Sequence, residues 1–374
     1  MANTVSTSTL RQEIWRKELF QNVLDNLYFK KFMGSGDGNI IQIMDDLKKN
    51  QGDTVTVPIS YKLSGDGITS DSELEGQEEA ISSYSDAILI DQIRNAVRMT
   101  GKLDEQKNVY NMRTDGKNKL SMWIQEFVER QLFMKMAGVN NTSLTDVAGN
   151  VVGTLCAWSN APTQVSTTDT GNGYGDRYLC ADYTSGAASL ATTDLLSPEL
   201  ISRARIKASQ KQSDGAPKMR PIKIDGVNHY VLFIHPWQAF DLKNNATYAQ
   251  AQREAQVRGG KNPIFTGALG VWDNVIVHEH EYVPFLDIDV AGHNFNATAA
   301  GTDFSADCFR ALLCGAQAAV WANTSTSMKM TEKTFDYGNK VGYATGLIGG
   351  IQKITFNSLD YGVLALDTAA TSLV

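Results

Sequence analysis

Apolar residues recur at helical spacing in two long stretches of the chain. Between Leu10 and Tyr28 they predict an amphipathic helix in an N-terminal arm. A second and stronger helix is predicted over 103–137. Its apolar face is formed by Leu120, Trp123, Ile124, Phe127, Val128 and Leu132. A glycine inside a helix costs about 1 kcal/mol, so Asp115-Gly116 predicts a kink or a break.

Strict alternation of apolar and polar residues predicts β-strands elsewhere. Over 54–60 the pattern is regular, and Pro58 favours an edge position because it has no N–H to donate. The clearest hairpin joins 221–224 to 229–234 through a turn at Asp225-Gly226. Further predicted elements are helices at 198–206, 249–258 and 304–322, a strand over 271–278 and two strands within 343–366. This order of elements predicts an α+β protein.

The length and composition are those of an ordinary folded protein with more than one lobe. The chain has 374 residues, of which 42% are hydrophobic and 20% are charged. The N-terminus lacks the apolar stretch of a signal peptide, and the longest weakly polar stretch, 311–322, is too short to span a membrane. Residues 139–194 are rich in Thr, Ser, Gly and Asn, which predicts a loop-rich insertion in a second lobe.

Charge is distributed unevenly along the chain. Residues 63–93 contain eight Asp or Glu and no Lys or Arg, whereas the whole chain has a net charge of −7. The remaining residues therefore sum to about +1. Directly after this acidic loop, residues 94–135 contain nine basic side chains against five acidic ones. An acidic segment followed by a basic one is the clearest anomaly in the sequence.

No stretch of the sequence carries a catalytic or cofactor motif. The glycine-rich segments at 171–175 and 259–261 match neither the dinucleotide fingerprint nor the phosphate loop. No nucleophile elbow is present, and the acidic residues of 63–93 lie in a polar setting that suits solvated carboxylates. An acidic chain without a basic stripe also argues against tight nucleic-acid binding. We therefore expect no catalytic site and no cofactor.

Two groups of potential metal ligands favour structural roles. His278-Glu279-His280-Glu281 follows a strand-like run, which places both His on one face and both Glu on the other. We interpret this as a solvated strand end, because two imidazoles alone make a weak metal site. The cysteines at 156, 180, 308 and 314 form no C-x-x-C pair and are expected to be free, mostly buried thiols.

Three short motifs, in this order, resemble the capsid proteins of N-four-like podoviruses: IDQIRNAVR at 90–98, NPIFTGALG at 262–270 and FNSLDYGV at 356–363. The order of arm, acidic loop, long helix, inserted lobe and returning strands is similar to the tailed-phage major capsid fold of the Hong Kong phage type. The similarity runs from about 60 to 368, and the insertion at 139–194 falls outside the motifs.

The resemblance implies a division of the chain into six parts. These are an N-terminal arm (1–53), a P-domain strand (54–62), the extended acidic loop (63–93), a P-domain spine helix (94–138), an A domain (139–330, with the insertion at 139–194) and C-terminal strands returning to the P domain (331–374).

The resemblance also implies that the extended loop lies across a neighbouring subunit. The acidic residues expected at this interface are Asp66, Asp71, Glu73, Glu75, Glu78 and Glu79. The basic bed that would receive them consists of Arg94, Arg98, Lys102, Lys107 and Arg113. Some relatives crosslink through a lysine on this loop, but 63–93 has none, so we expect a non-covalent contact.

The function implied by the resemblance is a structural one. Copies of the chain would form the pentamers and hexamers of an icosahedral phage head, assembled in the cytoplasm of a host bacterium around double-stranded DNA contacted non-specifically. The expected partners are a separate scaffolding protein, a portal protein and a decoration protein, with no membrane. An encapsulin-like nanocompartment shell shares the fold and is the alternative. An α/β enzyme with an unrecognised site is the third class.

Overall fold

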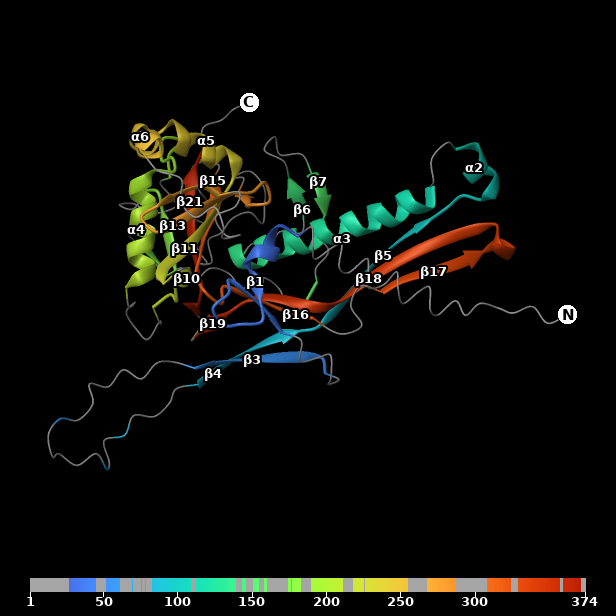
Figure 1. The fold of residues 1–374 in the computed structure, drawn as a ribbon, viewed down its shortest axis with the longest axis horizontal. Coiled ribbons are helices and arrows are strands. Elements are labelled where there is room, and N and C mark those ends of the chain that lie inside the picture. Colours follow the sequence, from blue (N-terminus) through green and yellow to red (C-terminus); the bar gives the residue numbers. More distant parts are fainter. Residues whose placement is uncertain are drawn as a thin grey trace.

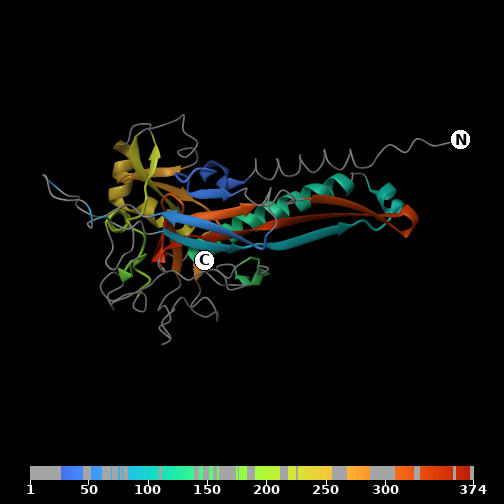
Figure 2. The same ribbon diagram turned by 90° about the horizontal axis from the view of Figure 1, so that it is seen from below.

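The computed structural model describes the chain in segments. These are residues 27–44, 52–60, 69, 75, 78, 83–108, 112–138, 143–145, 151–154, 158–159, 174–175, 177–182, 190–210, 218–224, 226–254, 268–286, 308–323, 329–356 and 359–370. They form an elongated lobe and a compact lobe, which lie side by side along the longest axis of the molecule (Figures 1 and 2). The helix predicted for the N-terminal arm lies outside the described residues.

The elongated lobe consists of one long helix on a narrow sheet. The sheet contains β1 (Met33–Gly34), β2 (Ile41–Met44), β5 (Asp91–Arg98), β16 (Ala319–Asn323), β17 (Lys329–Phe335) and β18 (Lys340–Lys353). The 14-residue β18 is its centre, with β5 along one edge and β16 and β17 along the other. Helix α3 (Met112–Ala137) packs its apolar face against β5 and β18.

The long helix was predicted correctly, but its break was not. A short helix α2 (Lys102–Lys107) ends at Asn108, and α3 then continues without interruption through Asp115 and Gly116. Gly116 is buried, and a Cβ atom there would lie 2.7 Å from the Met99 side chain that follows β5. A larger residue at this position would therefore require the flexible end of the Met99 side chain to move.

The compact lobe is a nine-stranded sheet covered on both faces. Its order is β12 (Ala268–Trp272), β13 (Val275–Glu279), β11 (Val227–Ile234), β15 (Cys308–Cys314), β21 (Val363–Ala369), β9 (Tyr178–Cys180) and β8 (Tyr174–Gly175). Strand β10 (Ile222–Ile224) pairs with β11, and β14 (Phe285–Leu286) pairs with β15. Helices α4 (Pro198–Ser209) and α5 (Pro236–Asn244) pack on one face, and α6 (Ala246–Glu254) follows them; the C-terminal half of α3 packs on the other face.

Alternation along β11 shows how the two faces are used. Val231 and Phe233 point toward α3, whereas Leu232 and Ile234 point toward α4 and α5. The predicted hairpin β10–β11 is present, with Gly226 at a positive φ of 82° in its turn. The predicted start of α4 is confirmed as well, because the Ser197 hydroxyl accepts a hydrogen bond from the Leu200 N–H.

The predicted helix over 304–322 is wrong. Residues 308–314 form β15 in the compact lobe, and 319–323 form β16 in the elongated lobe. All seven residues of β15 are buried, because the sheet is covered on both faces. A continuous apolar run has no period that separates a buried strand from a buried helix.

Several other element boundaries differ from the prediction. The strand expected over 271–278 is a hairpin of β12 and β13, with Asp273 and Asn274 at positive φ in its turn. The helix expected at 249–258 is described over 246–254. Both C-terminal strands exist, but β18 lies in the elongated sheet and β21 in the compact one. The chain therefore crosses between the lobes more often than a single boundary at 330 allows.

Two short hairpins lie outside the two main sheets. A short hairpin of β19 (Thr355–Phe356) and β20 (Leu359–Asp360) lies between β18 and β21. Strands β6 (Ser143–Thr145) and β7 (Val151–Thr154) pair with each other inside the predicted insertion. Among the described residues, no helix is both long and apolar enough to span a lipid bilayer.

Candidate functional site

The acidic segment is connected to the subunit by a ribbon of two strands that lies beneath the elongated sheet in Figure 1. Strands β3 (Thr54–Ser60) and β4 (Ser83–Leu89) pair in an antiparallel register from Thr54–Leu89 to Ser60–Ser83. One face of the ribbon is apolar and packs on β16 and on the segment 354–361. Pro58 lies in a strand of a two-stranded sheet, so the predicted edge position is confirmed.

The structure describes two of the six acidic residues expected at an interface. Glu75 and Glu78 are exposed, whereas Asp66, Asp71, Glu73 and Glu79 lie outside the described residues.

The other two acids of the segment are used within the subunit. Asp86 on β4 accepts hydrogen bonds from the Thr355 N–H (2.9 Å), the Thr355 hydroxyl (3.0 Å) and the Gln352 amide (3.3 Å). Asp91 at the start of β5 accepts from the N–H groups of Gln92 (2.7 Å) and Ser159 (3.4 Å). Asp86 thus anchors the ribbon to the end of β18, a role that a count of charges does not reveal.

The five basic residues of the expected bed lie on consecutive elements of the elongated lobe, and we call them the basic strip. Arg94 and Arg98 are exposed on β5, Lys102 and Lys107 are exposed on α2, and Arg113 lies in the first turn of α3. The Arg98 guanidinium also stacks 4.4 Å over the ring of Phe335.

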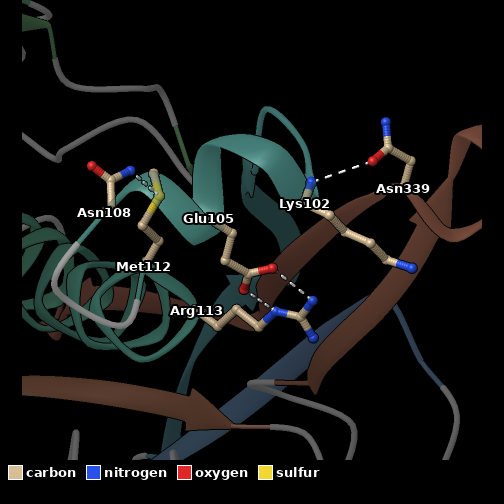
Figure 3. A network of polar contacts seen from close by, with 6 residues as sticks. All are labelled: Lys102, Glu105, Asn108, Met112, Arg113 and Asn339. Carbon is tan, nitrogen blue, oxygen red and sulfur yellow. Dashed lines mark hydrogen bonds and ion pairs between the residues drawn. The ribbon is translucent and has the colours of Figure 1, made fainter.

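Polar contacts order the end of the basic strip (Figure 3). Arg113 forms a bidentate ion pair with Glu105 across the break between α2 and α3. This pairing raises the pKa of the Arg113 guanidinium and lowers the pKa of the Glu105 carboxyl. The Lys102 N–H donates to the Asn339 side chain (3.3 Å) and so ties α2 to the β17–β18 hairpin. Arg113 is therefore partly neutralised within its own subunit.

The basic excess of 94–135 is only partly on the surface. Lys135 is 3% exposed, and its ammonium donates to the Trp158 carbonyl oxygen at 3.1 Å. Burial lowers the pKa of Lys135 to about 8. Lys119 pairs with Asp115 one helical turn earlier, at 2.9 Å. The sequence count of nine bases against five acids thus overstates the charge presented to a partner.

The interpretation of 278–281 as a solvated strand end is wrong for its histidines. His278 is fully buried, and its ring contacts that of Phe32 at 5.2 Å between centroids. His280 packs against Tyr28 (4.4 Å) and Phe133 (4.7 Å), so both histidines do lie on one side. Glu279 points away and pairs with Lys243 at 3.2 Å. The sequence signal for this burial is the group of aromatic residues at 28, 29 and 32, whose side chains pack over the end of β13.

This aromatic cluster fastens the start of the described chain to α3. The Tyr28 N–H donates to the buried Glu129 carboxylate at 2.7 Å, and burial raises the pKa of Glu129. Burial and the charge of Lys31 lower the pKa of His280 to about 4. The neutral His280 imidazole, packed among aromatic rings, acts here as an apolar side chain. The described ranges hold no group of three or more His, Cys, Asp or Glu arranged for a metal ion.

Two buried ion pairs were not predicted from the sequence. Arg310 and Asp367 are at most 1% exposed and form two hydrogen bonds of 2.7 and 2.5 Å. Lys353 and Asp360 form a second buried pair at 2.8 Å. Cys180, Cys308 and Cys314 are buried thiols outside any disulfide, and burial raises the pKa of Cys180 to about 12, which keeps it an unreactive thiol.

Comparison with known proteins gives a consistent result over almost the whole chain. The family model described as phage capsid protein matches residues 3–372. The major capsid protein of Pseudomonas phage KPP25 is 26% identical over 375 residues, covering 96% of this chain and 95% of that protein. Among solved structures, the capsid of Ralstonia phage GP4 matches with a TM-score of 0.74 at 29% identity, covering 93% of this chain and 92% of that one. The capsid asymmetric unit of cyanophage Pam1 has the same fold, with a TM-score of 0.69 at 21% identity over 100% of this chain and 96% of that one.

Proposed function

Because this chain belongs to the phage capsid protein family, we propose that its copies assemble into an icosahedral head that encloses double-stranded DNA. The relatives and structures named above are phage capsids rather than encapsulin shells, so the nanocompartment alternative is not supported. The family is a structural one and not a class of enzymes.

We further propose that the acidic loop of one subunit lies on the basic strip of a neighbouring copy. The observation that supports this proposal is the placement of the two segments. The end of the ribbon where β3 stops and β4 starts faces the compact-lobe side of the molecule, and α2 lies at the far end of the elongated lobe (Figures 1 and 2). Opposite charges at opposite ends favour contacts between copies in a fixed orientation.

The energy of such a contact is distributed over many weak pairs. An exposed ion pair contributes about 0–1 kcal/mol. Because every subunit of a shell makes these pairs, their small free energies add up and fix the position of each subunit relative to its neighbours. Since residues 63–93 contain no lysine, the contact is non-covalent in this proposal.

The remaining assignments follow from the same proposal. The compact lobe corresponds to the A domain, and the elongated lobe with α3 as its spine corresponds to the P domain. Subunits form pentamers and hexamers in the cytoplasm of a host bacterium. A separate scaffolding protein, a portal protein and a decoration protein are the proposed partners, and packaged DNA is contacted without sequence preference.

Reversal of the loop charge tests the interface. In the variant with Glu75→Lys, Glu78→Lys and Glu79→Lys, we expect a folded subunit that does not assemble, because the strip then meets like charge. Circular dichroism would check the fold and negative-stain electron microscopy the shells. A matched control reverses three acids of the compact lobe, Glu199, Asp273 and Glu281. Normal shells from the loop variant would reject the interface.

A further inference from the structure

The ribbon leaves the body of the subunit at the junction between β4 and β5, which we call its root. Leu89 ends β4, Ile90 follows, and Asp91 begins β5. Among the described strands, β3 and β4 pair only with each other. No backbone ladder to the main sheet therefore sets the direction of the ribbon. Its direction depends on the packing of its apolar face, on the hydrogen bonds of Asp86 and on contacts at the root.

Two residues from the predicted insertion hold the root by its backbone. The Trp158 indole N–H donates to the Asp91 carbonyl oxygen at 3.1 Å. The Ser159 hydroxyl donates to the Leu89 carbonyl oxygen at 2.6 Å, and the Ser159 N–H donates to the Asp91 carboxylate at 3.4 Å. The carbonyls on both sides of Ile90 are thus fixed. Ser159 adopts a positive φ of 61°, a conformation that a non-glycine residue keeps only when its surroundings impose it.

The same two residues are fastened to the spine helix. Trp158 is 1% exposed, and its ring packs edge-to-face on Phe127 of α3 with 5.6 Å between centroids. The buried ammonium of Lys135, also on α3, donates to the Trp158 carbonyl oxygen. Buried donors and acceptors need partners, so this contact resists opening.

Strand β18 also packs closely against the root, at Gly350. At Gly350, a Cβ atom would lie 2.4 Å from the Leu89 carbonyl oxygen and 2.9 Å from the Ser159 hydroxyl oxygen. Any side chain at this position would push the root away from the sheet, so the glycine is required for the close approach.

We propose that Trp158 and Ser159 form a clasp that fixes the angle between the ribbon and helix α3. This proposal rests on the acidic-loop interface, because the clasp would set the direction in which the loop reaches its neighbour. This segment lies outside the three sequence motifs of the resemblance. It contacts main-chain carbonyl oxygens of the root and the side chains of Phe127 and Lys135 on α3. The residues act by positioning and do not touch the neighbouring copy themselves.

The angle is measurable in the unassembled subunit. Nitroxide labels at Ser85, exposed on the ribbon, and Met122, exposed on α3, report their separation by pulsed electron paramagnetic resonance. Attachment through p-acetylphenylalanine avoids the four native cysteines. The clasp variant combines Trp158→Phe, which keeps a ring against Phe127, with Ser159→Ala. We expect its distance distribution to double in width or to shift, and shells formed from it to be irregular.

The matched control is Trp272→Phe, which removes an indole hydrogen bond to Ser202 (3.0 Å) in the compact lobe and should leave the distances unchanged. Should the double variant fail to fold, Ser159→Ala alone carries the test. An unchanged distance distribution in a folded clasp variant would overturn the proposal. The loop-reversal variant should keep the native distances while failing to assemble, so loss of the clasp and loss of the interface give different results.

Discussion

Arg310 and Asp367 stand directly opposite each other on β15 and β21 and form a bidentate ion pair that is shielded from solvent. The same guanidinium donates to the carbonyl oxygen of Ala137 at 3.2 Å, the last residue of α3. Arg310 therefore joins the central strands of the compact lobe to the C-terminal end of the spine helix. A cation at this end also interacts favourably with the helix dipole.

Removing one partner of this pair should destabilise the subunit strongly. Arg310→Met leaves the Asp367 carboxylate buried without its cation, and such variants typically lose about 3–5 kcal/mol. Urea unfolding followed by circular dichroism measures the loss. The double variant Arg310→Met with Asp367→Leu should recover most of it, since no buried charge remains at this site. The control, Arg203→Met, breaks the exposed pair with Glu199 and should cost less than about 1 kcal/mol.

The hydrogen bonds of Asp86 should control the exchange of the Thr355 amide. In Asp86→Ala, the Thr355 N–H and hydroxyl lose their acceptor, and a lost buried partner costs about 1–3 kcal/mol. Hydrogen–deuterium exchange at Thr355 should therefore become faster, and proteases should cut the ribbon sooner. Asp53→Ala removes only an exposed contact with the Thr54 hydroxyl and serves as the control. Equal exchange rates in the two variants would show that Asp86 does not anchor the ribbon.

The half-buried His280 predicts loss of stability in mild acid. The pKa of His280 is lowered to about 4 in the folded subunit, against an ordinary value of 6.5. The unfolded chain therefore binds more protons between these values, and stability present above pH 6.5 is lost as the pH falls toward 4. His280→Asn retains an acceptor for the Tyr282 N–H but does not titrate. Its free energy of unfolding should fall less steeply between pH 6.5 and 4 than that of the unmodified chain.

The difference between the His280→Asn variant and the unmodified chain gives the contribution of His280 to the pH dependence of stability, separate from that of its neighbours. Lys31 lies beside it, and Glu129, whose pKa is raised, contributes with the opposite sign. His235 on α5 also has its pKa lowered to about 4 by burial and remains in both proteins. Identical slopes for the two proteins would contradict a neutral His280 with a lowered pKa in the folded subunit.

The sequence predicted the elements that have a clear period and missed those that depend on distant partners. The apolar face of α3 and the hairpin of β10 and β11 are local signals, and both were predicted correctly. The run at 308–323 was misassigned because burial on both faces of β15 removes alternation. The break before α3 is stabilised by Glu105 and Arg113 across eight positions, which propensity alone does not report.

The same distinction applies to the candidate site. Acidic and basic segments are visible as counts, but Asp86, Asp91 and Lys135 are counted there although they serve the fold. Their partners, Thr355, Ser159 and Trp158, are 269, 68 and 23 positions away. Only the folded chain brings these residues together.

A charge exchange should rescue assembly if the acidic loop lies on the basic strip of a neighbour. Reversing Arg94, Lys102 and Lys107 to Glu should block assembly as the loop reversal does; Arg113 is left unchanged because it pairs with Glu105. Combining both sets in one chain restores opposite charges between copies, so shells should form again. Light scattering would follow the yield, and electron microscopy the product.

Salt provides an independent check of the same contact. Exposed charges are screened over about 8 Å at 0.15 M ionic strength and about 3 Å at 1 M. Assembly of the unmodified and the charge-exchanged chains should therefore slow in parallel as salt is raised. The blocked variants should partly recover in high salt, because screening weakens repulsion as well as attraction. Failure of the combined variant, with each parent folded, would mean that the loop and the strip meet other surfaces.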